Sequence, residues 1–171
     1  MMSKLYLMVG IPGSGKSTFA KSIQKAGDIY ISRDDIRFKL LQDNDNYFSK
    51  EDEVFKTFYT SINNSAEQYT RVFADATHLD FSSRAKLISH IDKDKFSELN
   101  IIYLNTPLEE CLKRNDKRKG RAKVPADVIK NMFEKLTIPN SNEPFDNIYI
   151  VHMGGDIDKI SYQRDILKEE M

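Results

Sequence analysis

The sequence predicts an α/β fold in which short buried strands alternate with helices around a mostly parallel, doubly wound sheet. Apolar strand-like runs recur at residues 5–9, 29–32, 72–74, 101–104 and 148–152, with helix-like patterns between them. This alternation is typical of parallel sheets covered by helices on both faces. A glycine-rich segment, Gly10-Ile11-Pro12-Gly13-Ser14-Gly15-Lys16-Ser17, joins the first run to the first helix-like stretch.

Length and composition indicate one compact domain, residues 1–171, with a sizeable core. The 26 basic and 26 acidic residues give a net charge of zero, which argues against a general nucleic-acid coat protein but not against an enzyme gripping a few nucleotides. The longest apolar runs fall far short of the roughly 20 residues of a membrane span. A single cysteine, Cys111, fits a reducing compartment and is predicted to be a core residue. We therefore expect a cytoplasmic protein without membrane association, and no feature calls for an obligate protein partner.

The segment from Gly10 to Ser17 fits the phosphate-binding pattern G-x-x-x-x-G-K-[ST] at every fixed position. Its glycines allow backbone N–H groups to turn toward an anion, and the following helix adds the positive end of its dipole. Lys16 is expected to reach the β- and γ-phosphates, and Ser17 to bind Mg²⁺. An ordinary Gly/Ser turn is the alternative, but the strand–helix setting favours a nucleoside triphosphate site. The predicted ATP-binding residues of this segment are Ile11, Pro12, Gly13, Ser14, Gly15, Lys16, Ser17 and Thr18.

Further helices follow from apolar spacing and capping residues. The stripe that includes Val54, Phe58 and Ile62 predicts a helix over residues 49–69 whose aromatics form core rather than a platform for bases. The other predicted elements are a helix over 82–91 capped by Ser82 or Ser83, helices with Pro107 and Pro125 as first residues, a surface loop over 137–147 and a final helix over about 157–168.

Polar residues that follow the strands should face one crevice, because ligands of open α/β sheets bind at the carboxyl ends of the strands. Asp34 and Asp35 follow the second strand, and either carboxylate can accept a proton from an acceptor hydroxyl or simply begin a helix. Arg37 is placed to hold a phosphate or carboxylate of the acceptor. Asp75 ends the third apolar run, the usual place of an acid that positions Mg²⁺. His78 is predicted to be a satisfied surface histidine.

A basic run from Lys113 to Lys123 lies between two predicted helices and contains Gly120. Such runs are commonly solvated faces. Phosphoryl transfer, however, needs cations around the spread negative charge, and closure of a mobile segment excludes water. The run is therefore predicted to be a lid.

Five motifs taken together resemble the phage-type polynucleotide 5′-kinase domain, within the broader P-loop kinase superfamily. They are the run from Gly10 to Ser17, Arg33-Asp34-Asp35-x-Arg37, Asp75-x-Thr77, Lys113-Arg114-Asn115 with Arg118, and Val124-Pro125. The resemblance spans most of the chain in order. It implies a three-layer P-loop kinase fold with a five-strand parallel sheet and a helical lid over about residues 113–123. It also implies ATP and Mg²⁺ as cofactors. By resemblance, Asp34 is the general base, Arg37 the ligand of an acceptor phosphate, Arg118 the transition-state arginine, and Arg114 a residue that stacks on adenine.

The sequence departs from that family at several points. One residue is inserted near Lys119-Gly120, so the roles of Arg118 and Arg121 can be exchanged. The family commonly has Asn where His78 stands and Gly where Pro144 stands, and no phosphatase motif is present. The predicted activity is transfer of the γ-phosphate of ATP to a hydroxyl, foremost the 5′-hydroxyl of a single-stranded nucleic-acid end. The alternatives are a kinase of a small hydroxylated molecule (a nucleoside, sugar or antibiotic) and a nucleotide-binding switch without an acceptor.

Overall fold

A computed structural model describes residues 2–161 and confirms the α/β architecture. One mixed sheet has the strand order β2-β3-β1-β4-β5-β6. The first five strands run parallel to one another. The strands are β1 (Ser3–Val9), β2 (Ile29–Ser32), β3 (Arg71–Asp75), β4 (Phe96–Asn105), β5 (Asn147–His152) and β6 (Ile157–Ser161).

The sixth strand corrects the prediction of a final helix. Residues 157–161 form β6, antiparallel to β5, and residues 162–168 lie outside the described residues. Gly154 and Gly155 both have φ near +100°, a conformation that glycine adopts without steric cost. This turn reverses the chain, so the next residues pair with the open edge of β5 instead of starting a helix.

Six α-helices connect or flank the strands in the described part of the chain. They are α1 (Lys16–Ile23), α2 (Arg33–Leu40), α3 (Glu51–Ser65), α4 (Phe81–Ser89), α5 (Leu108–Asp116) and α6 (Ala126–Lys135). Pro107 and Pro125 each precede their helix by one residue, because their ψ angles near 140° are extended. Asp80, rather than Ser82 or Ser83, caps α4, and its carboxylate accepts a hydrogen bond from the backbone N–H of Ser83 at 2.8 Å.

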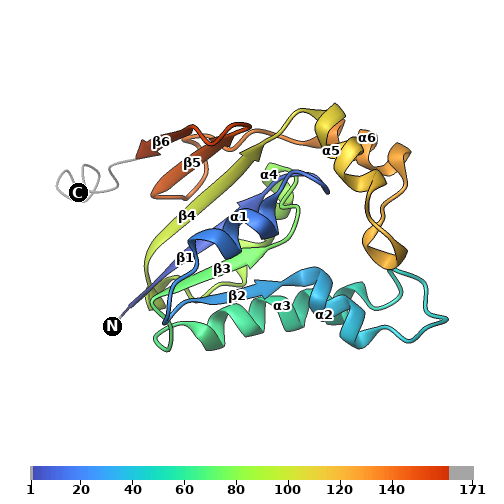
Figure 1. The fold of residues 1–171 in the computed structure, drawn as a ribbon. Coiled ribbons are helices and arrows are strands. Elements are labelled where there is room, and N and C mark those ends of the chain that lie inside the picture. The colour runs from blue at the N-terminus through green and yellow to red at the C-terminus, as the bar shows by residue number, and fades with distance from the viewer. Residues whose placement is uncertain (1, 162–171) are drawn as a thin grey trace.

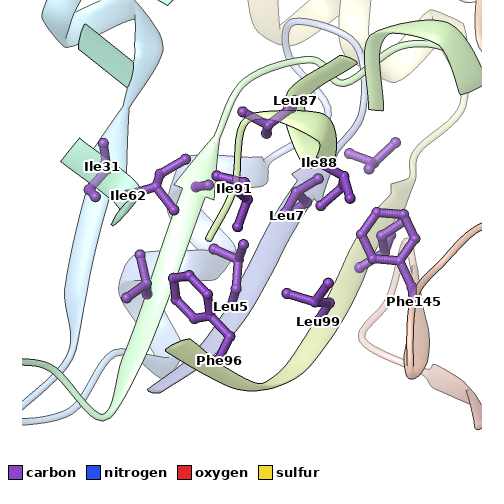
Figure 2. Packing of buried hydrophobic residues seen from close by; sticks show 14 of the residues in the cluster. Leu5, Leu7, Ile31, Ile62, Leu87, Ile88, Ile91, Phe96, Leu99 and Phe145 are labelled. Carbon is purple, nitrogen blue, oxygen red and sulfur yellow. The ribbon is translucent and has the colours of Figure 1, made fainter. Parts of the chain in front are cut away.

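Alternating side chains of β1 separate the core into two layers, one on each face of the sheet. Leu5, Leu7 and Val9 pack on one face with residues of α3 and α4, as Figure 2 shows for part of this cluster. Met8 packs on the other face with Ala20 of α1. Figure 1 shows α1 and α3 on opposite faces of the sheet. Val54, Phe58 and Ile62 of α3 are fully buried, so the apolar stripe of this helix is core, as predicted.

The segment predicted as a surface loop, residues 137–147, is partly buried. Phe145 is 2 % exposed, and Glu143 pairs with the fully buried Arg84 of α4 at 2.6 Å (Nε to Oε1). Arg84 also donates to the backbone carbonyls of His78 and Thr137. The segment therefore covers an otherwise unpaired cation. The prolines and asparagines of this segment are typical of a surface loop and do not predict the ion pair between Glu143 and Arg84.

A third apolar cluster fixes α5 and α6 against the glycine-rich loop. Ile11 from that loop packs with Cys111 of α5 and Ile129 of α6. Cys111 is buried, as predicted from the sequence. No helix among residues 2–161 is long and apolar enough to cross a membrane.

Candidate active site

The loop over residues 10–15 begins where β1 ends and is held by backbone contacts on both sides. The N–H of Gly10 donates to the carbonyl of Thr77 at 3.1 Å, after β3. The Thr106 hydroxyl, after β4, donates to the carbonyl of Ser14 at 2.8 Å. The Ser14 hydroxyl is buried and has no hydrogen-bond partner among the described residues. An unpaired buried donor within a loop of this shape suits a bound anion.

A pocket of about 540 Å³ opens beside this loop. Four stretches of the chain line it: the loop and start of α1, the end of β4, the end of α5 with the residues just after it, and the end of β5 with the turn that follows. The lining residues include Ser17, Thr18, Arg114, Arg118, Gly154 and Gly155. The volume falls within the range of small-molecule sites. The ends of β1, β4 and β5 thus border one pocket, whereas the polar residues that follow β2 and β3 are not among its lining residues.

Lys16 and Asp75 lie close enough for their charges to interact. The Lys16 ammonium lies 3.2 Å from the carbonyl of Ile11. Burial lowers the pKa of Lys16, and the carboxylates of Asp75 and Asp34 oppose that change. Asp75 is 8 % exposed, burial raises its pKa, and its Oδ2 accepts a hydrogen bond from the hydroxyl of Tyr30.

The donor set fits a magnesium ion held largely by phosphate. Asp75 Oδ1 and the Ser17 hydroxyl have no hydrogen-bond partner among residues 2–161, so both oxygens are available. Within that part of the chain no group of three or more His, Cys, Asp or Glu side chains gathers as a metal site. Mg²⁺ at phosphoryl-transfer sites commonly uses one or two protein oxygens with water and substrate phosphates.

Asp34 and Arg37, one turn apart on α2, are joined in a cluster with two residues that the sequence analysis did not single out. Arg37 Nη1 donates to Asp34 Oδ1 at 2.5 Å, and Arg37 Nη2 lies 2.9 and 2.8 Å from the two carboxylate oxygens of Glu51. The Tyr47 hydroxyl donates to the same Asp34 Oδ1 at 2.9 Å. Arg37 is 5 % exposed, whereas the Asp34 side chain is 62 % exposed. Asp35 instead stands at the capped start of the helix, where its N–H donates to the Ser32 hydroxyl.

The three arginines of the predicted lid segment lie in different places. Arg114 Nη1 approaches the carbonyls of Gly13 and Ser14 at 3.4 and 3.3 Å, and Arg118 lines the pocket. The Arg118 guanidinium has no ion-pair or hydrogen-bond partner in the described chain. Arg121 pairs with Asp43 at 3.2 Å, in the loop between α2 and α3, so the 120–122 turn touches that loop (Figure 1).

His78 is buried, which corrects the prediction of a surface histidine. It is 4 % exposed, its Nδ1 lies 2.6 Å from the carbonyl of Met8, and its ring stacks on Phe58. A backbone φ of +44° directs the ring inward. Its Nε2 has no partner among the described residues, and burial lowers the pKa of His78 to about 3.

This pKa predicts that acid destabilises the protein through His78. Unfolded His78 binds a proton below about pH 6.5, whereas the folded residue stays neutral down to about pH 3. Stability from this group is therefore complete above pH 6.5 and falls by about 1.4 kcal/mol per pH unit as the pH drops toward 3. Urea unfolding at pH 7, 5.5 and 4.5 should give a flatter pH dependence for His78→Asn than for the wild type. The same change at exposed His90 controls for loss of an imidazole, and equal slopes for His78→Asn and wild type would contradict the assignment.

Several residues of the site carry no recognisable sequence signal. Tyr30, Tyr47 and Glu51 contact the predicted residues only because the sheet and loops bring them together. Thr106 alone had a local sign, since it follows a strand and precedes a proline.

The parallel strand order, the phosphate-binding loop between β1 and α1, and the pocket beside it define a member of the P-loop kinase superfamily. The chain belongs to the AAA_33 family, described as an AAA domain, whose model matches residues 5–139.

Similar proteins agree with this assignment. The L-seryl-tRNA(Sec) kinase of Methanococcus maripaludis is 30 % identical over 158 residues, covering 83 % of this chain and 56 % of that protein. A putative bifunctional polynucleotide kinase/RNA ligase of Autographa californica nuclear polyhedrosis virus is 29 % identical over 153 residues, covering 82 % of this chain and 22 % of that protein. A chain in the solved structure of the Pnkp1/Rnl/Hen1 RNA repair complex is 27 % identical with a TM-score of 0.65, covering 83 % of this chain and 50 % of that one. This chain thus spans about half or less of the length of each of these relatives.

Proposed function

We propose that this chain is an ATP-dependent kinase that transfers the γ-phosphate to a hydroxyl, foremost the 5′-hydroxyl of a polynucleotide. The observation that carries the proposal is the exposed Asp34 carboxylate, which lies close enough to Lys16 for their charges to interact. A carboxylate beside the phosphate-binding lysine can act as a general base only on a second substrate whose hydroxyl reaches the γ-phosphate. The relatives support a nucleic-acid acceptor, because two of them are named as kinases of seryl-tRNA and of polynucleotides.

In this mechanism the acceptor oxygen attacks the γ-phosphorus while Asp34 takes the hydroxyl proton. The bond between the γ-phosphorus and the β–γ bridging oxygen breaks, and ADP leaves. Lys16 and the amides of residues 11–18 hold the phosphates, and Arg118 neutralises charge that develops on them. Arg114 lines the same pocket as Arg118, in line with a role beside the adenine, and Arg37 donates a hydrogen bond to the proposed base, Asp34.

Ser17 and Asp75 are the residues that would hold Mg²⁺, in line with their free oxygens. When bound, the ion supplies charge neutralisation on the phosphate oxygens. Burial of Asp75 and its contact with Tyr30 fix one carboxylate oxygen and leave the other for the ion.

An acceptor screen tests the proposal. The chain is incubated with γ-³²P-labelled ATP and Mg²⁺ and with 5′-hydroxyl oligoribonucleotides, 5′-hydroxyl oligodeoxyribonucleotides, nucleosides or sugars. We expect label at the 5′ end of the oligonucleotides and none on the same oligonucleotides that already carry a 5′-phosphate.

Two other outcomes identify the alternatives. Label on nucleosides or sugars but not on oligonucleotides indicates a kinase of small molecules, which the net charge of zero permits. Release of labelled phosphate without a labelled acceptor indicates a nucleotide-binding switch.

A further inference from the structure

The loop between α2 and α3 brings one phenol into the cluster around Asp34. Three hydrogen bonds close a triangle: Arg37 Nη1 to Asp34 Oδ1 at 2.5 Å, Tyr47 hydroxyl to the same oxygen at 2.9 Å, and Arg37 Nη1 to the Tyr47 oxygen at 2.9 Å. The Arg37 guanidinium also lies over the Tyr47 ring, 4.4 Å from its centroid.

These contacts leave the two oxygens of Asp34 unequal. Oδ1 accepts from both Arg37 and Tyr47, whereas Oδ2 has no hydrogen-bond partner among residues 2–161. A carboxylate held by one oxygen cannot rotate freely, so the other oxygen keeps a fixed direction. The side chain of Asp34 is 62 % exposed, so Oδ2 is accessible to an incoming hydroxyl.

We infer that Tyr47 is a positioning residue that, with Arg37, fixes the Asp34 carboxylate so that Oδ2 faces the acceptor hydroxyl. The inference rests on the proposed function, since it gives Asp34 the role of base. Arg37 itself is anchored by Glu51, whose two oxygens both accept from Nη2. Tyr47 supplies the second hydrogen-bond donor to Asp34 Oδ1, and its phenol adds no charge beside the carboxylate.

The state of the phenol fits this role. Although Tyr47 is 40 % exposed, partial desolvation of its hydroxyl and the negative charge of Asp34 raise the pKa of Tyr47 to about 12. The hydroxyl therefore keeps its proton at neutral pH and remains a donor. The ring is also tethered by edge contacts with Phe38 and Phe48, at centroid distances of 6.3 and 4.7 Å.

The kinetic test is Tyr47→Phe, which removes the hydroxyl and keeps the ring. We expect kcat for the labelled oligonucleotide to fall about 10- to 100-fold, the usual range for a hydrogen bond to a charged group, with the KM for ATP unchanged within about twofold. Tyr59→Phe is the matched control, because Tyr59 lies on α3 and its ring makes an edge contact with Phe55 and a tilted contact with His90 rather than contacts with Asp34. It should keep wild-type kcat. A Tyr47→Phe variant with wild-type kcat, or with kcat and thermal stability lowered in proportion, would overturn the inference.

A second measurement does not depend on activity. In the full chain labelled with [¹³Cζ]tyrosine, the Tyr47 resonance, assigned by its loss in Tyr47→Phe, should still report a protonated phenol at pH 10.5. Asp34→Ala should lower the ionisation midpoint. A midpoint near 10 that Asp34→Ala leaves unmoved overturns the inference whether or not the chain transfers phosphate. Absence of transfer by the wild type, with the titration as expected, contradicts the proposed function instead.

Discussion

Asp34→Asn is expected to lower kcat for phosphoryl transfer by about 10²- to 10⁴-fold, the usual contribution of a general base. Asparagine keeps the size of the side chain, and its amide oxygen can still accept from Arg37 and Tyr47, but it cannot take a proton from the acceptor. The pocket that would hold ATP does not include residue 34 among its lining residues. Nucleotide affinity, measured by calorimetry with ADP, should therefore stay within about threefold of the wild type.

Asp35→Asn is the matched control for this prediction. Asp35 is the next residue of the same helix and is also exposed, but no side-chain hydrogen bond joins it to Arg37 or Tyr47 among the described residues. Its replacement should leave kcat within about threefold of wild type. A large loss from Asp35→Asn with normal activity of Asp34→Asn would exchange the two roles.

Gly13→Ala is expected to abolish nucleotide binding. Gly13 has a φ of +85°, which costs an L-residue about 1–2 kcal/mol, and an added Cβ would lie 2.4 Å from the carbonyl oxygen of Cys111. That oxygen belongs to the backbone of α5 and cannot move aside without shifting the helix. The loop must therefore change shape, so its amides no longer converge on phosphate, and ADP affinity should fall at least about 100-fold.

Gly27→Ala is the control that distinguishes the effect of backbone strain from the effect of the clash with Cys111. Gly27 has nearly the same φ, +89°, but lies before β2, and an added Cβ would only meet the side-chain oxygen of Thr70 at 3.3 Å. Both variants should lose stability in urea unfolding, but Gly27→Ala should bind ADP like the wild type. Equal ADP affinities of the two variants would show that the close approach of Gly13 to α5 does not shape the nucleotide site.

The sequence predicted the features that depend on local pattern. The five parallel strands follow from apolar runs, and the phosphate-binding loop follows from residues 10–17. Ser17, Arg114 and Arg118 line one pocket, but their roles there stay predictions, and those of Arg114 and Arg118 rest on the family resemblance.

The errors concern contacts that no local pattern encodes. His78 was assigned to the surface because its burial depends on a positive φ and on the position of Phe58 in a distant helix. The sequence predicts that the loop around Glu143 lies on the surface, because the ion-pair partner of Glu143, Arg84, is 59 residues away in the chain. Tyr47 and Glu51 carry no local signal for the same reason, since their contacts with the Asp34–Arg37 pair form only after α2, α3 and the loop between them pack together.

The most direct test of the account is a crystal structure with Mg²⁺, a non-hydrolysable ATP analogue and a short 5′-hydroxyl oligonucleotide. In that structure the acceptor O5′ should lie about 2.6–3.2 Å from Asp34 Oδ2 and in line with the γ-phosphorus, with Oδ1 still bound to Arg37 and Tyr47. An acceptor hydroxyl beyond the reach of Asp34, or a carboxylate turned away from the γ-phosphate, would contradict it.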